Sequence, residues 1–140
     1  MKKQDKINLN KIHVLDDDRY FLQLVNKLIH KYDKRILQKL YTNNSQFLED
    51  LNNSILPNLL IIDYNLGYQN HFHQTAHKVL NQIDAFSKSI PVILISGESN
   101  LGLLEEYSKY RNIEYIVKDN MFAKNLFQTL NNYNSIPIKH

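Results

Sequence analysis

The run Leu59-Leu60-Ile61-Ile62-Asp63 decides the fold of this 140-residue chain. Four apolar residues in succession, ended by an acid, are typical of a strand that is covered on both faces of its sheet. The run Val92-Ile93-Leu94-Ile95, followed by Ser96, repeats the pattern. Strands of this kind occur in parallel sheets with helices on both sides, so the chain is predicted to be an α/β protein.

Outward from these two strands, apolar runs alternate with helical patterns along the chain. Further strands are predicted at Ile12–Leu15, Arg35–Tyr41 and Ile113–Val117, the second of them with Ile36 and Leu40 inward. Helices are expected over residues 20–29, 44–55, 73–86, 100–110 and 120–133, the second of them capped by Asn44 or Ser45. Strands that alternate with helices predict βαβ units, whose right-handed crossovers build a doubly wound sheet. Residues 11–133 would form this single domain, with tails at 1–10 and 134–140.

The composition excludes several classes of protein. The chain has no cysteine, which rules out disulfide scaffolds, cysteine-ligated zinc, thiol catalysis and iron–sulfur clusters. The longest apolar runs are far shorter than the ~20 residues that a membrane-spanning helix needs. The N-terminal segment lacks the apolar core of a signal peptide. The chain is therefore expected to act in the cytoplasm, without a membrane partner.

The net charge of +3 and the sequence pI of about 9.0 raise the question of nucleic-acid binding. Of the 17 basic residues only Arg19, Arg35 and Arg111 are arginine, and the lysines are scattered along the chain. A nucleic-acid interface gathers its basic residues on one face or helix. No nucleic-acid partner is therefore expected.

Polar residues stand at the predicted strand ends. Asp16-Asp17-Asp18, Asp63, Ser96 and Lys118 each follow or end a strand. Because parallel strands end at one edge of the sheet, where ligands of open α/β folds bind, these side chains are expected to converge there. Carboxylates brought so close repel one another and attract a cation, and hard oxygen ligands of this kind suit Mg²⁺.

The order of these residues resembles that of the receiver domain of two-component response regulators, over about Lys11 to Tyr133. The matching stretches are residues 13–18, 60–66, 91–97 and 115–118. The resemblance implies the flavodoxin-like strand order 2-1-3-4-5 and a stand-alone, chemotaxis-regulator-like response regulator. It also implies a sensor histidine kinase or a histidine phosphotransfer protein as phosphoryl donor. The signal would pass to an unknown downstream protein, through protein–protein contact or a phosphorelay.

The resemblance assigns roles to the strand-end residues. Asp63 would be the phosphoacceptor, and Lys118 and the Ser96 hydroxyl would bind the phosphoryl oxygens. The metal ligands implied are Asp16, Asp17, Asp63 and the backbone carbonyl of Asn65. Asp18 would start the first helix, where a carboxylate favours the helix dipole. Such a domain catalyses its own phosphorylation and dephosphorylation and is not otherwise an enzyme.

Two further roles follow from the same resemblance. Ser96 and Tyr115 would form the conformational switch that responds to the phosphoryl group. Asn65 and Glu98 would set the lifetime of the aspartyl phosphate, which we expect to be short because both side chains let water approach. The face remodelled by the switch would present Glu105, Glu106, Lys109, Lys124 and Asn125 to a partner.

The sequence departs from the receiver pattern at three places. Asp119 follows Lys118, where proline in a cis bond is usual. The loop 66–73 lacks the usual proline and Asp-Gly turn, so its path is open. Ser96 stands where threonine is commoner, a change that keeps the hydroxyl.

Three alternatives accompany this interpretation. A pseudo-receiver would have the same fold and bind partners without phosphate. An aspartyl-nucleophile phosphatase or phosphotransferase would use Asp16 and Asp18, which are two residues apart, but it leaves Asp63 unexplained. His71, His73 and His77 have spacings that suit a zinc site, although solvated histidines explain them more simply.

Overall fold

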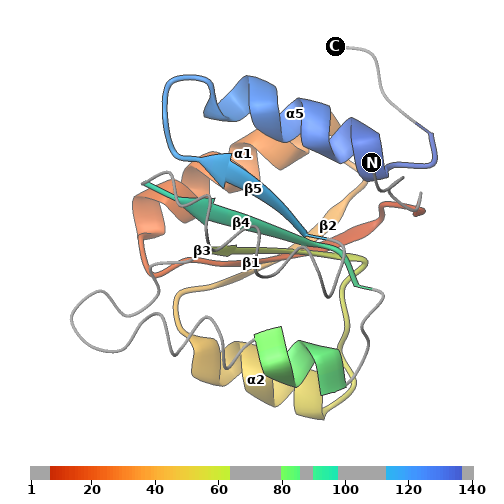
Figure 1. Ribbon diagram of the computed structural model, residues 1–140. Coiled ribbons are helices and arrows are strands. Elements are labelled where there is room, and N and C mark those ends of the chain that lie inside the picture. Colours follow the sequence, from red (N-terminus) through yellow and green to blue (C-terminus); the bar gives the residue numbers. More distant parts are fainter. Residues whose placement is uncertain (1–6, 64–79, 86–89, 98–112, 137–140) are drawn as a thin grey trace.

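The computed structural model describes residues 7–63, 80–85, 90–97 and 113–136. In this part of the chain, five parallel strands form one sheet in the order β2-β1-β3-β4-β5 (Figure 1). The strands are β1 (Lys11–Leu15), β2 (Leu37–Tyr41), β3 (Leu59–Asp63), β4 (Val92–Ser96) and β5 (Ile113–Val117). The predicted α/β class, parallel sheet and strand order are confirmed.

Helices cover both faces of the sheet. The helices α1 (Arg19–Tyr32) and α5 (Phe122–Tyr133) lie on one face, and α2 (Asn44–Asn52) lies on the other beside the helical residues 80–85 (Figure 1). The rest of the helix predicted over 73–86, and the whole of the one predicted over 100–110, lie outside the described residues. No helix in the described part of the chain is both long enough and apolar enough to cross a membrane.

The core has two layers, one on each side of the sheet. Every residue of β3 and β4 is buried, as the unbroken apolar runs predicted. Alternation along β3 sends Ile61 toward α1 and α5, and Leu60 and Ile62 toward α2 and residues 80–85. Each fully buried leucine or isoleucine contributes about 1.5–3 kcal/mol to the free energy of folding.

His13, in the middle of β1, is the exceptional member of the second layer. Its side chain is fully buried, with ring centroids 5.5 Å from Tyr41 and 6.2 Å from Phe47. Neither ring nitrogen has a hydrogen-bond partner among the described residues. Burial first, and then the charges of Lys11 and Lys39, lower the pKa of His13 to about 4, against the opposing charge of Asp50. His13 therefore packs as a neutral aromatic ring.

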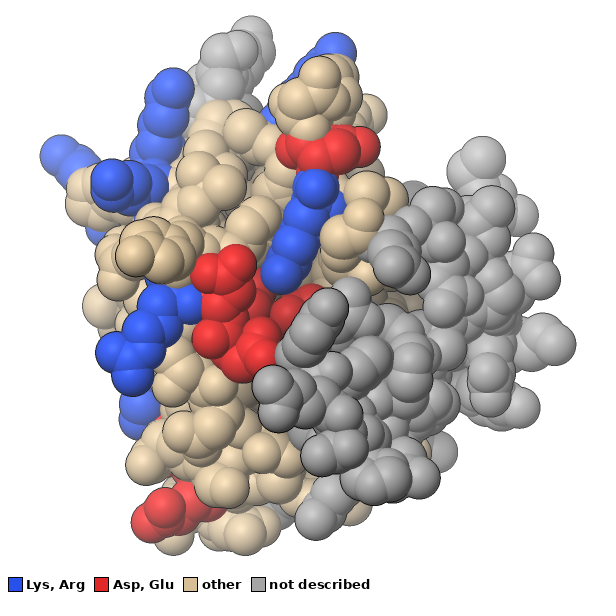
Figure 2. All heavy atoms as spheres, turned by 90° about the vertical axis from the view of Figure 1, so that its left-hand side faces the viewer, with Lys and Arg blue, Asp and Glu red and all other residues tan. Residues whose placement is uncertain are grey.

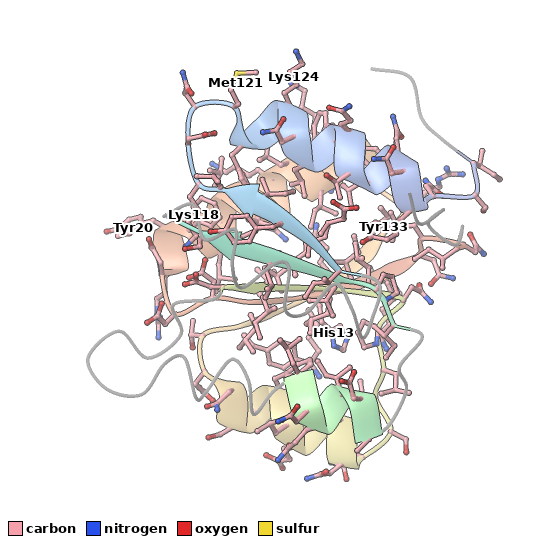
Figure 3. All side chains as sticks on the ribbon, viewed as in Figure 1. His13, Tyr20, Lys118, Met121, Lys124 and Tyr133 are labelled. Carbon is pink, nitrogen blue, oxygen red and sulfur yellow. The ribbon has the colours of Figure 1, made fainter. Side chains whose placement is uncertain are left out.

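The apolar stripe of α1 differs from the predicted one at two positions. The helical spacing of apolar residues predicts a stripe of Tyr20, Phe21, Leu24, Val25, Leu28 and Ile29. The exposed fractions of Tyr20 and Leu24 are, however, 90% and 43%. The helix instead buries Leu22 and Tyr32 together with the predicted Val25 and Ile29. Tyr20 belongs to the first turn and points away from the sheet (Figure 3), so the core does not reach it.

The helix α2 is capped by an earlier residue than predicted, and it also ends earlier. Its cap is Asn43, whose side chain accepts a hydrogen bond from the backbone N–H of Gln46 at 3.1 Å. The helix stops at Asn52 because Ser54 takes a left-handed conformation, with φ of 61°. That turn lets the backbone N–H of Ile55 donate to the carbonyl of Asp50 at 2.9 Å.

The segments next to the predicted domain boundaries are packed rather than free. Ile7 and Asn134 form a parallel bridge, in which the backbone N–H of Ser135 donates to the carbonyl of Ile7 at 2.7 Å. Leu9 is 4% exposed and belongs to the core. The residues 7–10 and 134–135, which the sequence analysis assigned to tails, thus pack at the end of the sheet where the strands begin, opposite the polar strand ends.

Candidate functional site

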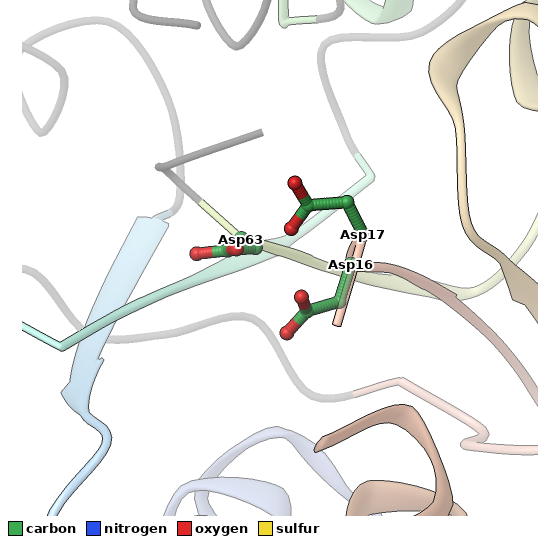
Figure 4. A group of neighbouring side chains, drawn as sticks. All are labelled: Asp16, Asp17 and Asp63. Carbon is green, nitrogen blue, oxygen red and sulfur yellow. The ribbon is translucent and has the colours of Figure 1, made fainter. Parts of the chain in front are cut away.

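Three carboxylates meet where β1 and β3 end. Asp16 and Asp17 follow β1, and Asp63 is the last residue of the neighbouring β3. One oxygen of each carboxylate lies within 4.8 Å of the others (Figure 4). Asp16 and Asp63 are buried, with 0% and 3% exposed, whereas Asp17 is exposed. The predicted convergence of these acids is confirmed, and the cluster reaches solvent through Asp17.

Lys118 brings a positive charge to the same cluster. It follows β5, and its backbone N–H donates to the carbonyl of Ser96 at 2.8 Å. Its Nζ lies 3.0 Å from Oδ2 of Asp16 and 3.5 Å from Oδ2 of Asp63. Figure 2 shows acidic side chains gathered in the middle of this face, with basic side chains beside them. Among the contacts of the described residues, one ammonium thus faces three carboxylates.

Burial and the neighbouring carboxylate together shift the pKa of Asp16. Burial first, and then the charge of Asp63, hold the pKa of Asp16 well above the usual range of a carboxyl. The backbone N–H of Asp18, which donates to Oδ1 of Asp16 at 2.8 Å, and Lys118 oppose this shift. A bound cation would relieve the repulsion, and the donor set of carboxylate oxygens fits Mg²⁺, which commonly binds through one or two carboxylates and several waters.

Asp18 is not part of the cluster. Its Oδ1 accepts hydrogen bonds from the backbone N–H groups of Tyr20, at 3.0 Å, and Phe21, at 3.3 Å. Asp18 is thus the N-cap of α1, which confirms its predicted place at the start of the first helix.

Ser96 and Tyr115 occupy neighbouring strands near the cluster. Ser96 ends β4 with 2% of its surface exposed, and it is paired in register with Val117. Tyr115 is half-buried on β5, opposite Leu94, and packs against the core layer on the α2 side. Their role as a switch stays a prediction.

Asp119 builds the turn that leads into α5. The Lys118–Asp119 bond is trans. The Asp119 carboxylate accepts a hydrogen bond from the backbone N–H of Met121 at 2.9 Å, and its carbonyl accepts one from that of Phe122 at 3.1 Å. These bonds delay the start of α5 to Phe122, two residues after the predicted Asn120.

One contact at the site was not predicted from the sequence. The ammonium of Lys118 lies over the ring of Phe21, with Nζ 4.3 Å from the ring centroid. Phe21 is in the first turn of α1 and Lys118 follows β5, so no local sequence pattern connects them. Only the packing of α1 against the sheet brings them together.

Several candidate residues lie outside the described part of the chain. They are the predicted metal ligand Asn65, the lifetime residue Glu98, the histidines His71, His73 and His77, and the partner-face residues Glu105, Glu106 and Lys109. The two other residues of that face are described: Lys124 is exposed and Asn125 is half-buried.

Comparison with known proteins finds similarity in structure. No family model matches the chain, and no curated protein sequence matches it. A response regulator receiver domain protein from Clostridium thermocellum superposes with a TM-score of 0.72 and 22% identity, over 89% of this chain and 93% of that one. The chemotaxis protein CheY4 of Vibrio cholerae superposes with a TM-score of 0.68 and 16% identity, over 87% and 96% of the two chains.

A third solved structure agrees with these two. A CheY-like receiver domain protein from Methanospirillum hungatei superposes with a TM-score of 0.68 and 16% identity, over 88% of this chain and 91% of that one. At such identities the likeness is one of fold. The chain therefore has the fold of response regulator receiver domains, as the resemblance of its motifs implied.

Proposed function

We propose that the protein is a single-domain response regulator that accepts a phosphoryl group on Asp63. One observation carries the proposal: the carboxylates of Asp16, Asp17 and Asp63 lie together beside the Lys118 ammonium, at the edge where ligands of this fold bind. The similarity in fold to receiver domains supports the same conclusion.

The proposed reaction is a transfer from phosphohistidine to Asp63. An oxygen of the Asp63 carboxylate attacks phosphorus, the phosphorus–nitrogen bond breaks, and the released imidazole takes up a proton. Such a transfer depends mainly on positioning and on charge neutralisation. Lys118, 3.5 Å from Asp63, and the Ser96 hydroxyl would bind the phosphoryl oxygens. Mg²⁺ held by Asp16, Asp17, Asp63 and the Asn65 carbonyl would supply further positive charge to them.

The donor in this proposal is a sensor histidine kinase or a histidine phosphotransfer protein, in the cytoplasm. Phosphorylation adds charge and strong acceptor oxygens, toward which Ser96 would move. Tyr115 would then turn inward and remodel the face that includes Lys124 and Asn125. The phosphoryl group needs only to favour one of two states of this face. The output is contact with a downstream protein or transfer of the phosphoryl group in a relay, and the chain has no other enzymatic activity.

The alternative of a phosphatase that uses Asp16 and Asp18 is less well supported. The Asp18 carboxylate is engaged as the cap of α1, and the carboxylate that joins Asp16 and Asp17 is that of Asp63. An arrangement centred on Asp63 uses all three clustered acids, whereas the phosphatase uses one of them.

Labelling with acetyl phosphate tests the proposal. In the presence of Mg²⁺, intact mass should show the addition of one phosphoryl group, which EDTA prevents. Asp63→Asn should abolish the addition, whereas the control Asp33→Asn, in the turn between α1 and β2, should keep it. Equal labelling of Asp63→Asn would make the nucleophile assignment wrong. A parent protein that takes no label would indicate a module that works without phosphate.

A further inference from the structure

We propose that Phe21 is a positioning residue, whose ring holds the Lys118 ammonium in place for phosphoryl transfer. The inference rests on the proposed function, in which Lys118 binds the phosphoryl oxygens. It concerns a residue on α1 that takes no part in the chemistry itself.

The geometry is that of a cation–π contact. Nζ of Lys118 lies 4.3 Å from the centroid of the Phe21 ring, inside the ~6 Å at which such contacts are effective. The Lys118 side chain is 17% exposed, so the attraction acts on a charge that is partly removed from water. The ring therefore attracts the same ammonium that Asp16 and Asp63 attract.

The Phe21 ring is itself held by two neighbouring elements. Asp18 accepts the hydrogen bond of the Phe21 backbone N–H at 3.3 Å, which fixes the first turn of α1. Phe122, which begins α5 and is 3% exposed, packs edge-on against the ring at a centroid distance of 4.8 Å and an interplanar angle of 64°. The contact with Phe122 restrains the ring, whose face lies under Lys118.

A restrained ammonium matters because lysine carries its charge on a long flexible stem. Asp16 draws Nζ to 3.0 Å, closer than the 3.5 Å that separates it from Asp63, the proposed phosphoacceptor. Without the ring, the ammonium keeps its ion pairs with the two carboxylates but can shift further toward Asp16, away from Asp63. Loss of the aromatic face should then slow labelling of Asp63 about 3- to 30-fold, the range expected from the strength of cation–π contacts.

Two substitutions separate the aromatic face from simple apolar packing. Phe21→Leu keeps an apolar side chain without a ring, and should slow labelling by acetyl phosphate within that range. Phe21→Tyr keeps the ring face and should label within about twofold of the parent protein. Tyr20→Leu is the matched control, since Tyr20 is the adjacent aromatic residue and is 90% exposed; it should label at the parental rate.

A spectroscopic readout judges the contact independently of labelling. Protons on the Lys118 ε-carbon, close to the ring face, should resonate upfield in the parent and in Phe21→Tyr, and lose this shift in Phe21→Leu. Absence of the shift in the parent, or parental labelling of a folded Phe21→Leu, overturns the inference. Equal slowing in Phe21→Tyr and Phe21→Leu also overturns it. If the parent shows the shift but takes no label, the proposed function fails, and the positioning role of Phe21 in phosphoryl transfer fails with it.

Discussion

Acidification should weaken this fold through His13. The imidazole is fully buried in β1, and its pKa is lowered from 6.5 to about 4 in the folded protein. In the unfolded chain the same group takes up a proton near pH 6.5. Between these two values the unfolded state binds more protons than the folded one, so the free energy of unfolding falls as the pH falls.

The magnitude follows from the two pKa values. From about pH 7.5 to about pH 4.5, protonation of His13 in the unfolded state should remove about 2.5 kcal/mol of stability. The neighbouring charges change the pKa of His13 in the same direction as burial does, because Lys11 and Lys39 lower it more than Asp50 raises it. Domains of this size are stable by roughly 5–15 kcal/mol, so the loss should be easy to measure.

Urea unfolding at a series of pH values measures it, with His13→Leu as the variant. Leucine has a similar volume and no titratable group, so the variant should lose about 2–3 kcal/mol less than the parent over this pH range. Other titratable groups are present in both proteins, so their contribution cancels when the loss of stability in the variant is subtracted from that in the parent. His30→Gln, at an exposed position of α1, is the control and should follow the parent. Parallel pH profiles for His13→Leu and the parent would falsify the assignment of acid sensitivity to His13.

Three further predictions concern the site and its surroundings. Asp18→Ala should remove the cap of α1 and cost about 1 kcal/mol of stability while labelling by acetyl phosphate continues; loss of labelling in folded protein would place Asp18 in the chemistry. Ser54→Gly should raise the free energy of unfolding by about 0.5–1 kcal/mol, because glycine adopts a φ of 61° without strain; a decrease in urea unfolding would contradict this. Replacement of Asn65 or Glu98 by a bulkier residue should slow the decay of the aspartyl phosphate, and unchanged decay in both variants would remove their proposed role.

Most of the fold was predictable because its central strands carry an unambiguous signal. The first four residues of β3 and of β4 are all apolar, so neither strand offers an alternating polar face to solvent. The errors fall where tertiary context decides. The periodicity of α1 includes Tyr20, but that residue lies in a turn that extends beyond the core. The end of α2 depends on the left-handed conformation of Ser54, which propensity does not favour.

The candidate site was predictable to the same extent as the sheet. Asp16, Asp17, Asp63 and Lys118 could be brought together from the strand ends alone, because parallel strands finish at one edge. The contact between Phe21 and Lys118 could not, because it depends on how α1 packs against the sheet. Sequence patterns thus predicted where the charged groups lie, whereas the contact of Phe21 with one of them, Lys118, could be found only in the structure.

The charges at this edge connect the stability of the fold to its proposed chemistry. Asp16 is fully buried beside Asp63, and the resulting rise in its pKa means that the ionised pair is costly to keep. Lys118 offsets part of that cost through its contacts with both acids. In the proposed function, a divalent cation would lower the repulsion, and the phosphoryl group would offer Lys118 new oxygens to contact. These changed contacts would favour one conformation of the surrounding strands over another. If the proposed function holds, we expect the repulsion between these buried carboxylates to contribute to the switch, provided that the Lys118 ammonium is held where the new charge appears.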